Sequence, residues 1–192
     1  MKDRETRTVT VGKLELRASD KGNMLVGYAA KFNTMSDDLG GFLETIAPGA
    51  FSRAIKEKHD VRALFNHDPN YVLGRTKSGT LTLREDGTGL EMCCAMPDTQ
   101  TARDLMESVK RGDIDQQSFS FRCLSDSWAM RDGMSVRTLQ DLELFDVSPV
   151  TYPAYQDTSV ASRSLDAHKK TLVVIAPDVM RKAKLMLAKA KI

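Results

Sequence analysis

The sequence lacks most of the features that mark secreted and membrane proteins. It contains only three cysteines, two of them the neighbours Cys93 and Cys94, and no Cys-x-x-Cys pair. Adjacent cysteines rarely bridge each other, so this usage fits a reducing compartment better than a disulfide framework. The first residues lack the apolar core of a signal peptide, and no apolar run approaches the length of a membrane span. These absences predict a protein that is made and used in a cytoplasm, without a membrane partner.

A strong excess of positive charge is also missing. The chain has 28 Lys and Arg against 26 Asp and Glu among its 192 residues, a formal net charge of +2. Affinity for nucleic acid depends on clustered basic residues that neutralise phosphates, whereas most of this chain interleaves bases with acids. No direct nucleic-acid partner is therefore expected. The length suits one sizeable domain with at most a short appendage.

Most of the chain up to residue 155 is predicted to form strands separated by turns. Alternating and β-branched apolar residues indicate strands over 8–18, 24–32, 61–69, 71–76, 79–85, 89–96, 116–130 and 134–155. A helix is expected to begin near Pro48, and a longer one to occupy 96–113 and to end at Gly112. The strand 61–69 is expected to stop at Asp68-Pro69. Tight turns without regular strand–helix alternation predict an α+β fold, mainly an antiparallel β-barrel surrounded by a few helices.

The composition changes near the end of the chain. Small and polar residues over 157–171 predict a linker, and the range 177–192 predicts a basic helix that docks on the body or on a partner. We therefore expect a main domain over 1–165 and a linker with a basic helical tail over 166–192.

The stretch QQSFSFRC at 116–123 places two different chemistries on the two faces of one strand. Successive strand side chains point to opposite faces, so Ser118 and Ser120 share one side while Phe119 and Phe121 share the other. The phenylalanine face predicts core. The serine face is either a solvated surface or the wall of a site.

A serine nucleophile needs a base, most often histidine, and a third group that orients the base. Of the three histidines, His59 lies at a helix end and His168 in the linker, whereas His67 ends an apolar strand beside a turn. Asp146 lies among apolar residues late in another strand. A buried carboxylate needs a charged or hydrogen-bonding partner, which a histidine would supply. His67, Ser118 and Asp146 are therefore the candidate catalytic set.

Several motifs, in this order, resemble the prohead serine protease family of tailed bacteriophages. They read GYAAKFN, ETIAPGAF, ALFNHDPNYVLGRT, DGTGLEMCCAM, VKRGDIDQQSFSFR and LFDVSPVTYPAY, and the resemblance covers roughly residues 24–160. It implies a fold similar to that of the herpesvirus assembly proteases, a β-barrel ringed by helices. It also implies an enzyme that trims scaffold and capsid proteins inside the immature head.

The resemblance assigns roles at the matching positions. It implies His67 of FNHD as the base and Ser118 of SFSF as the nucleophile. The family usually has glycine where this chain has Ser120, so a second hydroxyl lies two residues from the first. The LFDVSP motif implies Asp146 as the third member. Glu143 remains a nearby alternative, and the herpesvirus relatives use a second histidine instead.

Arg75, in LGRT, also matches the family pattern. It is a candidate for support of the oxyanion or the substrate, although a structural salt bridge is the favoured interpretation. Backbone amides near Ser118 are further candidates for the oxyanion donor.

Two other kinds of site are disfavoured. His67 with Asp68 and Asp60 lacks the three or four convergent ligands, with a short His or Cys spacing, that zinc requires. Cys93 and Cys94 lack a basic neighbour that would lower a thiol pKa, so they are interpreted as packing residues. No metal and no cofactor is expected.

The resemblance implies a serine endopeptidase that acts on the scaffold segment and the major capsid protein, and on itself. It would work inside the assembling prohead in the host cytoplasm, and self-association is expected. The alternative is a non-enzymatic capsid assembly or scaffolding factor that retains the protease fold, which the charged tail after residue 165 motivates. An unrelated esterase or amidase is disfavoured because no Gly-x-Ser-x-Gly elbow is found.

Overall fold

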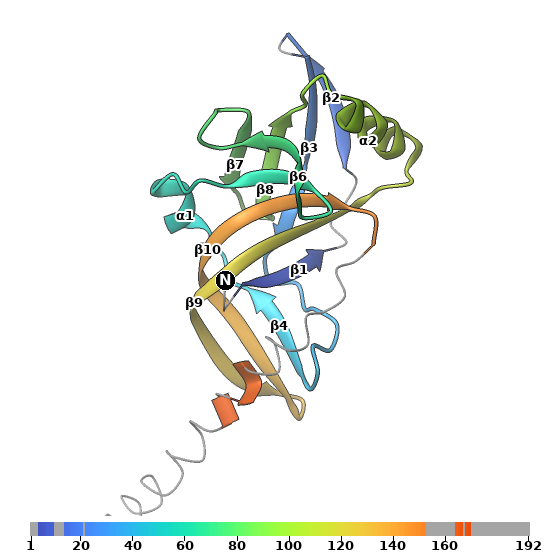
Figure 1. The fold of residues 1–192 in the computed structure, drawn as a ribbon. Coiled ribbons are helices and arrows are strands. Elements are labelled where there is room, and N and C mark those ends of the chain that lie inside the picture. Colours follow the sequence, from blue (N-terminus) through green and yellow to red (C-terminus); the bar gives the residue numbers. More distant parts are fainter. Residues whose placement is uncertain (1–3, 10–13, 21, 153–163, 167, 170–192) are drawn as a thin grey trace, which may run out of the picture.

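Strands dominate the computed structural model, which describes residues 4–9, 14–20, 22–152, 164–166 and 168–169 (Figure 1). The strands are β1 (Glu5–Val9), β2 (Glu15–Ser19), β3 (Gly22–Lys31), β4 (Phe42–Ile46), β5 (Arg62–Phe65), β6 (Asp68–Arg75), β7 (Leu81–Glu85), β8 (Gly89–Ala95), β9 (Gln116–Arg131) and β10 (Met134–Val150). The helices are α1 (Ser52–Lys56) and α2 (Gln100–Arg111). The predicted α+β class is confirmed in this strand-rich form.

The strands pair into two sheets. One sheet has the order β1-β9-β10-β5-β6, with β4 also paired to β10, and the other has the order β2-β3-β8-β7. The long strand β10 pairs antiparallel with β9, and it pairs parallel with β4 and β5. These two parallel pairings depart from the antiparallel pattern that the tight turns predicted. The pairings among the described residues form two sheets, and closure into a barrel stays a prediction.

The core confirms the interpretation of the phenylalanine face of β9. Phe119 and Phe121 are fully buried and stack with their ring centroids 5.1 Å apart, while Phe51 meets Phe119 edge-on at 5.7 Å. Leu25 and Met92 of the second sheet belong to the same apolar cluster. Each such buried side chain stabilises the fold by roughly 1.5–3 kcal/mol. The two sheets are thus joined by one core, which holds the start of β9 firmly.

The helices differ in how closely they follow the prediction. α2 lies inside the predicted range, and it ends at Gly112, whose φ of +83° is the left-handed conformation that glycine adopts without strain. The other helix, α1, is a single short turn that begins at Ser52, after a series of turns over 48–51.

Two strand predictions are wrong in detail. The predicted strand 8–18 is divided between β1 and β2, which belong to different sheets. The predicted stop at Asp68-Pro69 is wrong because the turn lies two residues earlier, and Asp68 begins β6. Proline is tolerated in β6 because this strand lies at the edge of its sheet, where a backbone donor can be missing.

The end of the chain is described only in part. His168 stacks on Trp128 with ring centroids 4.6 Å apart, and Leu165 packs with Leu39 and Phe42. The predicted basic helix 177–192 lies outside the described residues, as does most of the predicted linker, so the domain division at residue 165 stays a prediction. No helix in the described part of the chain is long and apolar enough to span a membrane.

Candidate active site

The β9–β10 ladder places two pairs of polar residues on one face. Ser118 lies opposite Ser148, and Ser120 lies opposite Asp146. A register shift between Leu144 and Asp146 marks a β-bulge, which brings the carboxylate opposite Ser120. Bulges of this kind redirect side chains beside active sites. The four polar side chains consequently lie close together on one side of the ladder.

The hairpin between β5 and β6 supplies the histidine. Asn66 and His67 form its two-residue turn, with φ values of +53° and +58°. Left-handed backbone is uncommon for residues other than glycine, although Asn and His adopt it more readily than most. The Asn66 backbone N–H donates to the Pro149 carbonyl at 3.0 Å, and its side-chain oxygen accepts from the Thr151 N–H at 2.9 Å. These bonds hold the turn against the end of β10.

The structure brings the three predicted residues into hydrogen-bonding contact. His67 Nε2 lies 2.7 Å from Ser118 Oγ, and His67 Nδ1 lies 2.5 Å from Asp146 Oδ1. Because an ionised carboxylate only accepts, Nδ1 carries the proton that it donates to Asp146. Nε2 of a neutral ring is then free to accept the proton of Ser118. This order of hydroxyl, imidazole and carboxylate is the one that general-base activation of a serine requires.

Asp146 is almost fully buried, yet it favours the ionised form. Burial alone would raise its pKa, but the hydrogen bond and charge of His67, followed by hydrogen bonds from Ser120 and Ser148, outweigh this and lower the pKa. Ser148 Oγ donates to Oδ1 at 2.8 Å, while Ser120 Oγ and the Arg4 guanidinium donate to Oδ2. Sequence reasoning missed Ser148 and Arg4. Alternation along the strand could have found Ser148, which lies two residues after Asp146.

Strand β1 covers the serine. It lies antiparallel along the edge of β9, with Thr8 opposite Ser118 (Figure 1). Ser118 is 0% exposed, and its Oγ also donates to the Arg7 carbonyl at 3.0 Å. A hydroxyl has one proton, so the Arg7 carbonyl and His67 Nε2 compete for it. Docked β1 therefore both excludes solvent from Ser118 and weakens its activation.

Buried ion pairs hold β1 in this place. Arg7 binds Glu44 of β4 at 2.7 Å, and Glu5 binds Arg137 of β10 at 2.9 Å. All four side chains are nearly inaccessible to solvent. Charges removed from water are stable only while they are paired, so detaching β1 requires this cluster to rehydrate.

Comparison with known proteins gives the site a context. The sequence profile described as caudovirus prohead serine protease matches residues 12–171. The chain belongs to this family. It is 28% identical over 142 residues to the prohead protease of Escherichia phage T5, a match that covers 72% of this chain and 64% of the T5 protein. The chain thus spans less than two thirds of that relative's length.

A solved structure supports the fold of this prohead protease family member. The bacteriophage T4 capsid assembly protease, gp21, is similar with a TM-score of 0.53 and 11% sequence identity. The similar region covers 77% of this chain and 97% of the T4 chain. At this level of identity the likeness concerns the fold alone.

The structure places the other predicted site residues of this family member away from the histidine. Glu143 pairs with Arg122 at 2.5 Å across the β9–β10 ladder. Arg75 makes a two-pronged contact with Asp60, at 2.6 Å from its Nε and 2.5 Å from its Nη2. His59, which was expected at a helix end, is partly exposed, and its Nε2 lies 3.1 Å from Glu57.

Two thiols of the protein are held in their protonated form. Burial raises the pKa of the Cys94 thiol, and of the Cys123 thiol, to about 12. Thiolates are the reactive species, so these two groups are poor nucleophiles at neutral pH. Within the described ranges, no group of three or more His, Cys, Asp or Glu side chains is arranged to hold a metal ion.

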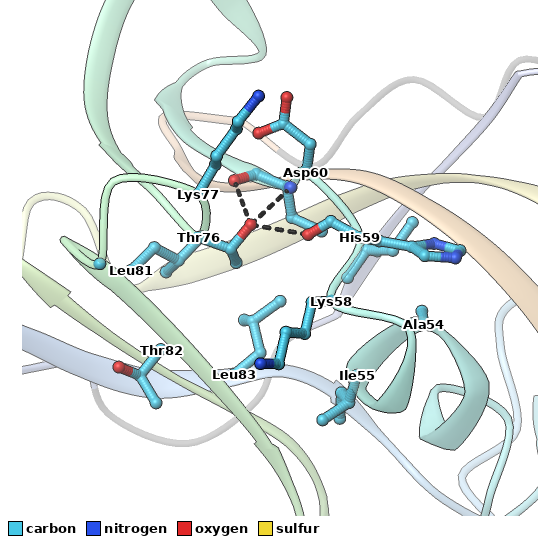
Figure 2. A pocket seen from close by; sticks show the side chains of 13 residues that line it. Ala54, Ile55, Lys58, His59, Asp60, Thr76, Lys77, Leu81, Thr82 and Leu83 are labelled. Atoms are coloured by element: carbon cyan, nitrogen blue, oxygen red, sulfur yellow. Dashed lines mark hydrogen bonds between the residues drawn. The ribbon is translucent and has the colours of Figure 1, made fainter.

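A hollow of about 650 Å³ lies elsewhere, between α1, the segment 58–61 that precedes β5, and strand β7 (Figure 2). Its apolar floor includes Ile55 and Leu83, and the Lys58 side chain extends toward Leu83. The Thr76 hydroxyl donates to the His59 carbonyl at 2.7 Å and so ties one wall together. None of the three candidate catalytic residues lines this hollow, which is therefore separate from the site.

Proposed function

We propose that this chain is a serine endopeptidase that cleaves scaffold and capsid protein segments, and itself, during maturation of a phage head. The observation that carries the proposal is the continuous contact from Ser118 Oγ through the His67 ring to Asp146, at 2.7 and 2.5 Å. Membership of the prohead serine protease family supports the same activity, and the family profile covers most of the chain.

The mechanism is acyl transfer. Ser118 Oγ attacks the carbonyl carbon of the scissile peptide bond while its proton passes to His67 Nε2. Asp146 holds the ring with Nδ1 protonated and stabilises the imidazolium. His67 then gives the proton to the leaving amine as the C–N bond breaks. Water repeats the sequence on the acyl-enzyme ester, with His67 as base, and releases the acid product.

Access to the site depends on β1. A peptide carbonyl can reach Ser118 only after β1 separates from the edge of β9, because the hydroxyl is fully covered in the docked arrangement. An extended substrate segment could then pair with the edge that β1 leaves. Because the buried ion cluster holds β1 in place, it supports the proposal that the protease is inactive until it enters a crowded assembly. In this proposal the assembly is the prohead, and self-association triggers the activation.

The relatives' names support the choice of substrate. One is a prohead protease and the other a capsid assembly protease, so the major capsid protein and the scaffold segment are the proposed partners. Glu143 and Arg75 are proposed as structural ion-pair residues because each is engaged with an oppositely charged neighbour.

The test is co-expression with the capsid protein, with mass spectrometry of the products. We expect the wild-type chain to yield defined capsid and self-cleavage products, and Ser118→Ala to yield none. Ser120→Ala is the matched control, because it removes a hydroxyl from the same strand face and should retain measurable processing.

The assignment of the nucleophile would be wrong if Ser118→Ala processed the capsid protein as the wild type does. If the wild type produced no cleavage yet co-purified with assembled shells, the alternative of a non-enzymatic assembly factor would replace the protease.

A further inference from the structure

We infer that Ser120 and Ser148 are positioning residues that keep Asp146 ionised and oriented toward His67, an inference that rests on the proposed function. The two hydroxyls flank the carboxylate from opposite sides. Ser148 donates to the oxygen that faces His67, and Ser120 donates to the other oxygen. In the ladder Ser120 lies opposite Asp146, and Ser148, two residues after Asp146, lies opposite Ser118.

The direction of the Ser120 hydrogen bond follows from its second partner. Arg4 Nε lies 3.0 Å from Ser120 Oγ, and a guanidinium can only donate. Ser120 Oγ therefore accepts from Arg4, and its own proton is directed to Asp146 Oδ2. The hydroxyl is 0% exposed, so no bulk water can replace either bond.

Ser148 completes the set. An ionised carboxylate offers about four acceptor positions. Here Oδ1 accepts from His67 and Ser148, while Oδ2 accepts from Ser120 and Arg4. All four positions are filled, so the carboxylate has one orientation in which every donor is satisfied. Rotation about its terminal bond would break all of these hydrogen bonds at once.

The serines become more important in the open state. Arg4 directly precedes β1, so it is expected to leave with that strand when the site opens. Asp146 then loses its cationic partner but stays buried against the ladder. Ser120 and Ser148 belong to β9 and β10, and they remain as its fixed donors. At position 120 the chain thus has a donor where the family resemblance leads one to expect glycine.

Titration of the Asp146 carboxyl tests the inference without any need for proteolysis. We would prepare Ser120→Ala, Ser148→Ala and the double variant in a Ser118→Ala background, with ¹³C-labelled aspartate. Hydrogen bonds to an ionised group are strong enough that each loss should raise the Asp146 midpoint by about one pH unit. Ser125→Ala is the control, since Ser125 is an exposed serine on the same strand. It should leave the midpoint unchanged.

The second measurement uses chains with Ser118 intact. Each single variant should lower kcat about tenfold, the effect of one hydrogen bond to a charged group, and should leave KM unchanged. A purely structural role would reduce the active fraction without moving the Asp146 midpoint.

The outcomes separate this inference from the proposed function. Midpoints within about 0.2 pH units of the wild type in both single variants would overturn the positioning role, whatever the protease does. Processing that survives Ser118→Ala would overturn the nucleophile assignment, and a wild type that cleaves nothing would overturn the protease. Either result would leave the titration result standing. A variant that fails to fold is identified by its far-UV circular dichroism, and Ser120→Gly, which restores the residue usual in the family, is then titrated in its place.

Discussion

Replacement of Asp146 by Asn changes one oxygen of the site into an NH₂ group, and the surrounding donors decide which one. Arg4 can only donate, so the amide oxygen must take the Oδ2 position, where it accepts from Arg4 and Ser120. The NH₂ group then takes the Oδ1 position and faces His67 and Ser148, both of which can accept. The opposite orientation would place two donors against each other.

In this variant the hydrogen-bond network stays satisfied, but the His67 ring adopts the tautomer that cannot act as a base. His67 Nδ1 must accept from Asn, so the single ring proton moves to Nε2 and points at Ser118. The ring can no longer take the serine proton. In the well-studied serine protease triad the same exchange lowers kcat about 10⁴-fold, which corresponds to about 5.4 kcal/mol of barrier. Because every buried group keeps a partner, we expect Asp146→Asn to remain folded, with little change in unfolding midpoint.

The assay is the rate of capsid processing at equal concentrations of wild type, Asp146→Asn and Glu143→Gln. The last variant is the matched control, because Glu143 was the alternative third member and it pairs with Arg122 instead. It should cleave at close to the wild-type rate. The reasoning would be refuted if folded Asp146→Asn retained more than about a tenth of wild-type activity, which corresponds to a barrier change of only about 1.4 kcal/mol. It would also be refuted if Glu143→Gln lost as much activity as Asp146→Asn.

Two further predictions concern charged groups away from the catalytic contacts. Arg137→Ala should lower the free energy of unfolding by about 3–5 kcal/mol in urea titrations, because it leaves Glu5 and Glu44 short of a buried partner; an unchanged midpoint would contradict this. Hydrogen bonds from Arg75 lower the pKa of the Asp60 carboxyl to about 2 from its ordinary value of 3.8. The stability that this ionised carboxyl contributes is therefore present above pH 3.8 and is lost as the pH falls toward 2. In Arg75→Ala the carboxyl ¹³C midpoint should rise toward 3.8, and a midpoint that stayed near 2 would show that Arg75 is not the cause.

Local pattern in the sequence was sufficient for several parts of the site. Alternation along β9 separated the phenylalanine core from the serine face, since strand side chains alternate whatever the rest of the fold does. The left-handed glycine at position 112 ended α2 for an equally local reason. The need of a buried carboxylate for a partner pointed from Asp146 to a histidine before any contact was known.

Local pattern failed where two backbone states were both compatible with the residues. The sequence around Asp68-Pro69 suggested a stop, but Asn66 and His67 can adopt left-handed backbone and make the turn themselves. This shift of two residues matters, because it puts His67 at the tip of the hairpin rather than within a strand.

Tertiary structure alone decided which strands meet. Three features of the site depend on pairing between segments more than 25 residues apart, or on the register of that pairing. They are the bulge before Asp146, the placement of Ser148 and Arg4 around its carboxylate, and the cover of β1 over Ser118. Such pairing is selected by the total burial of two sheets against one core, a sum over the whole domain that no short stretch contains. The residue types at the site could thus be predicted from the chain, whereas their closed, covered arrangement could be known only from the fold.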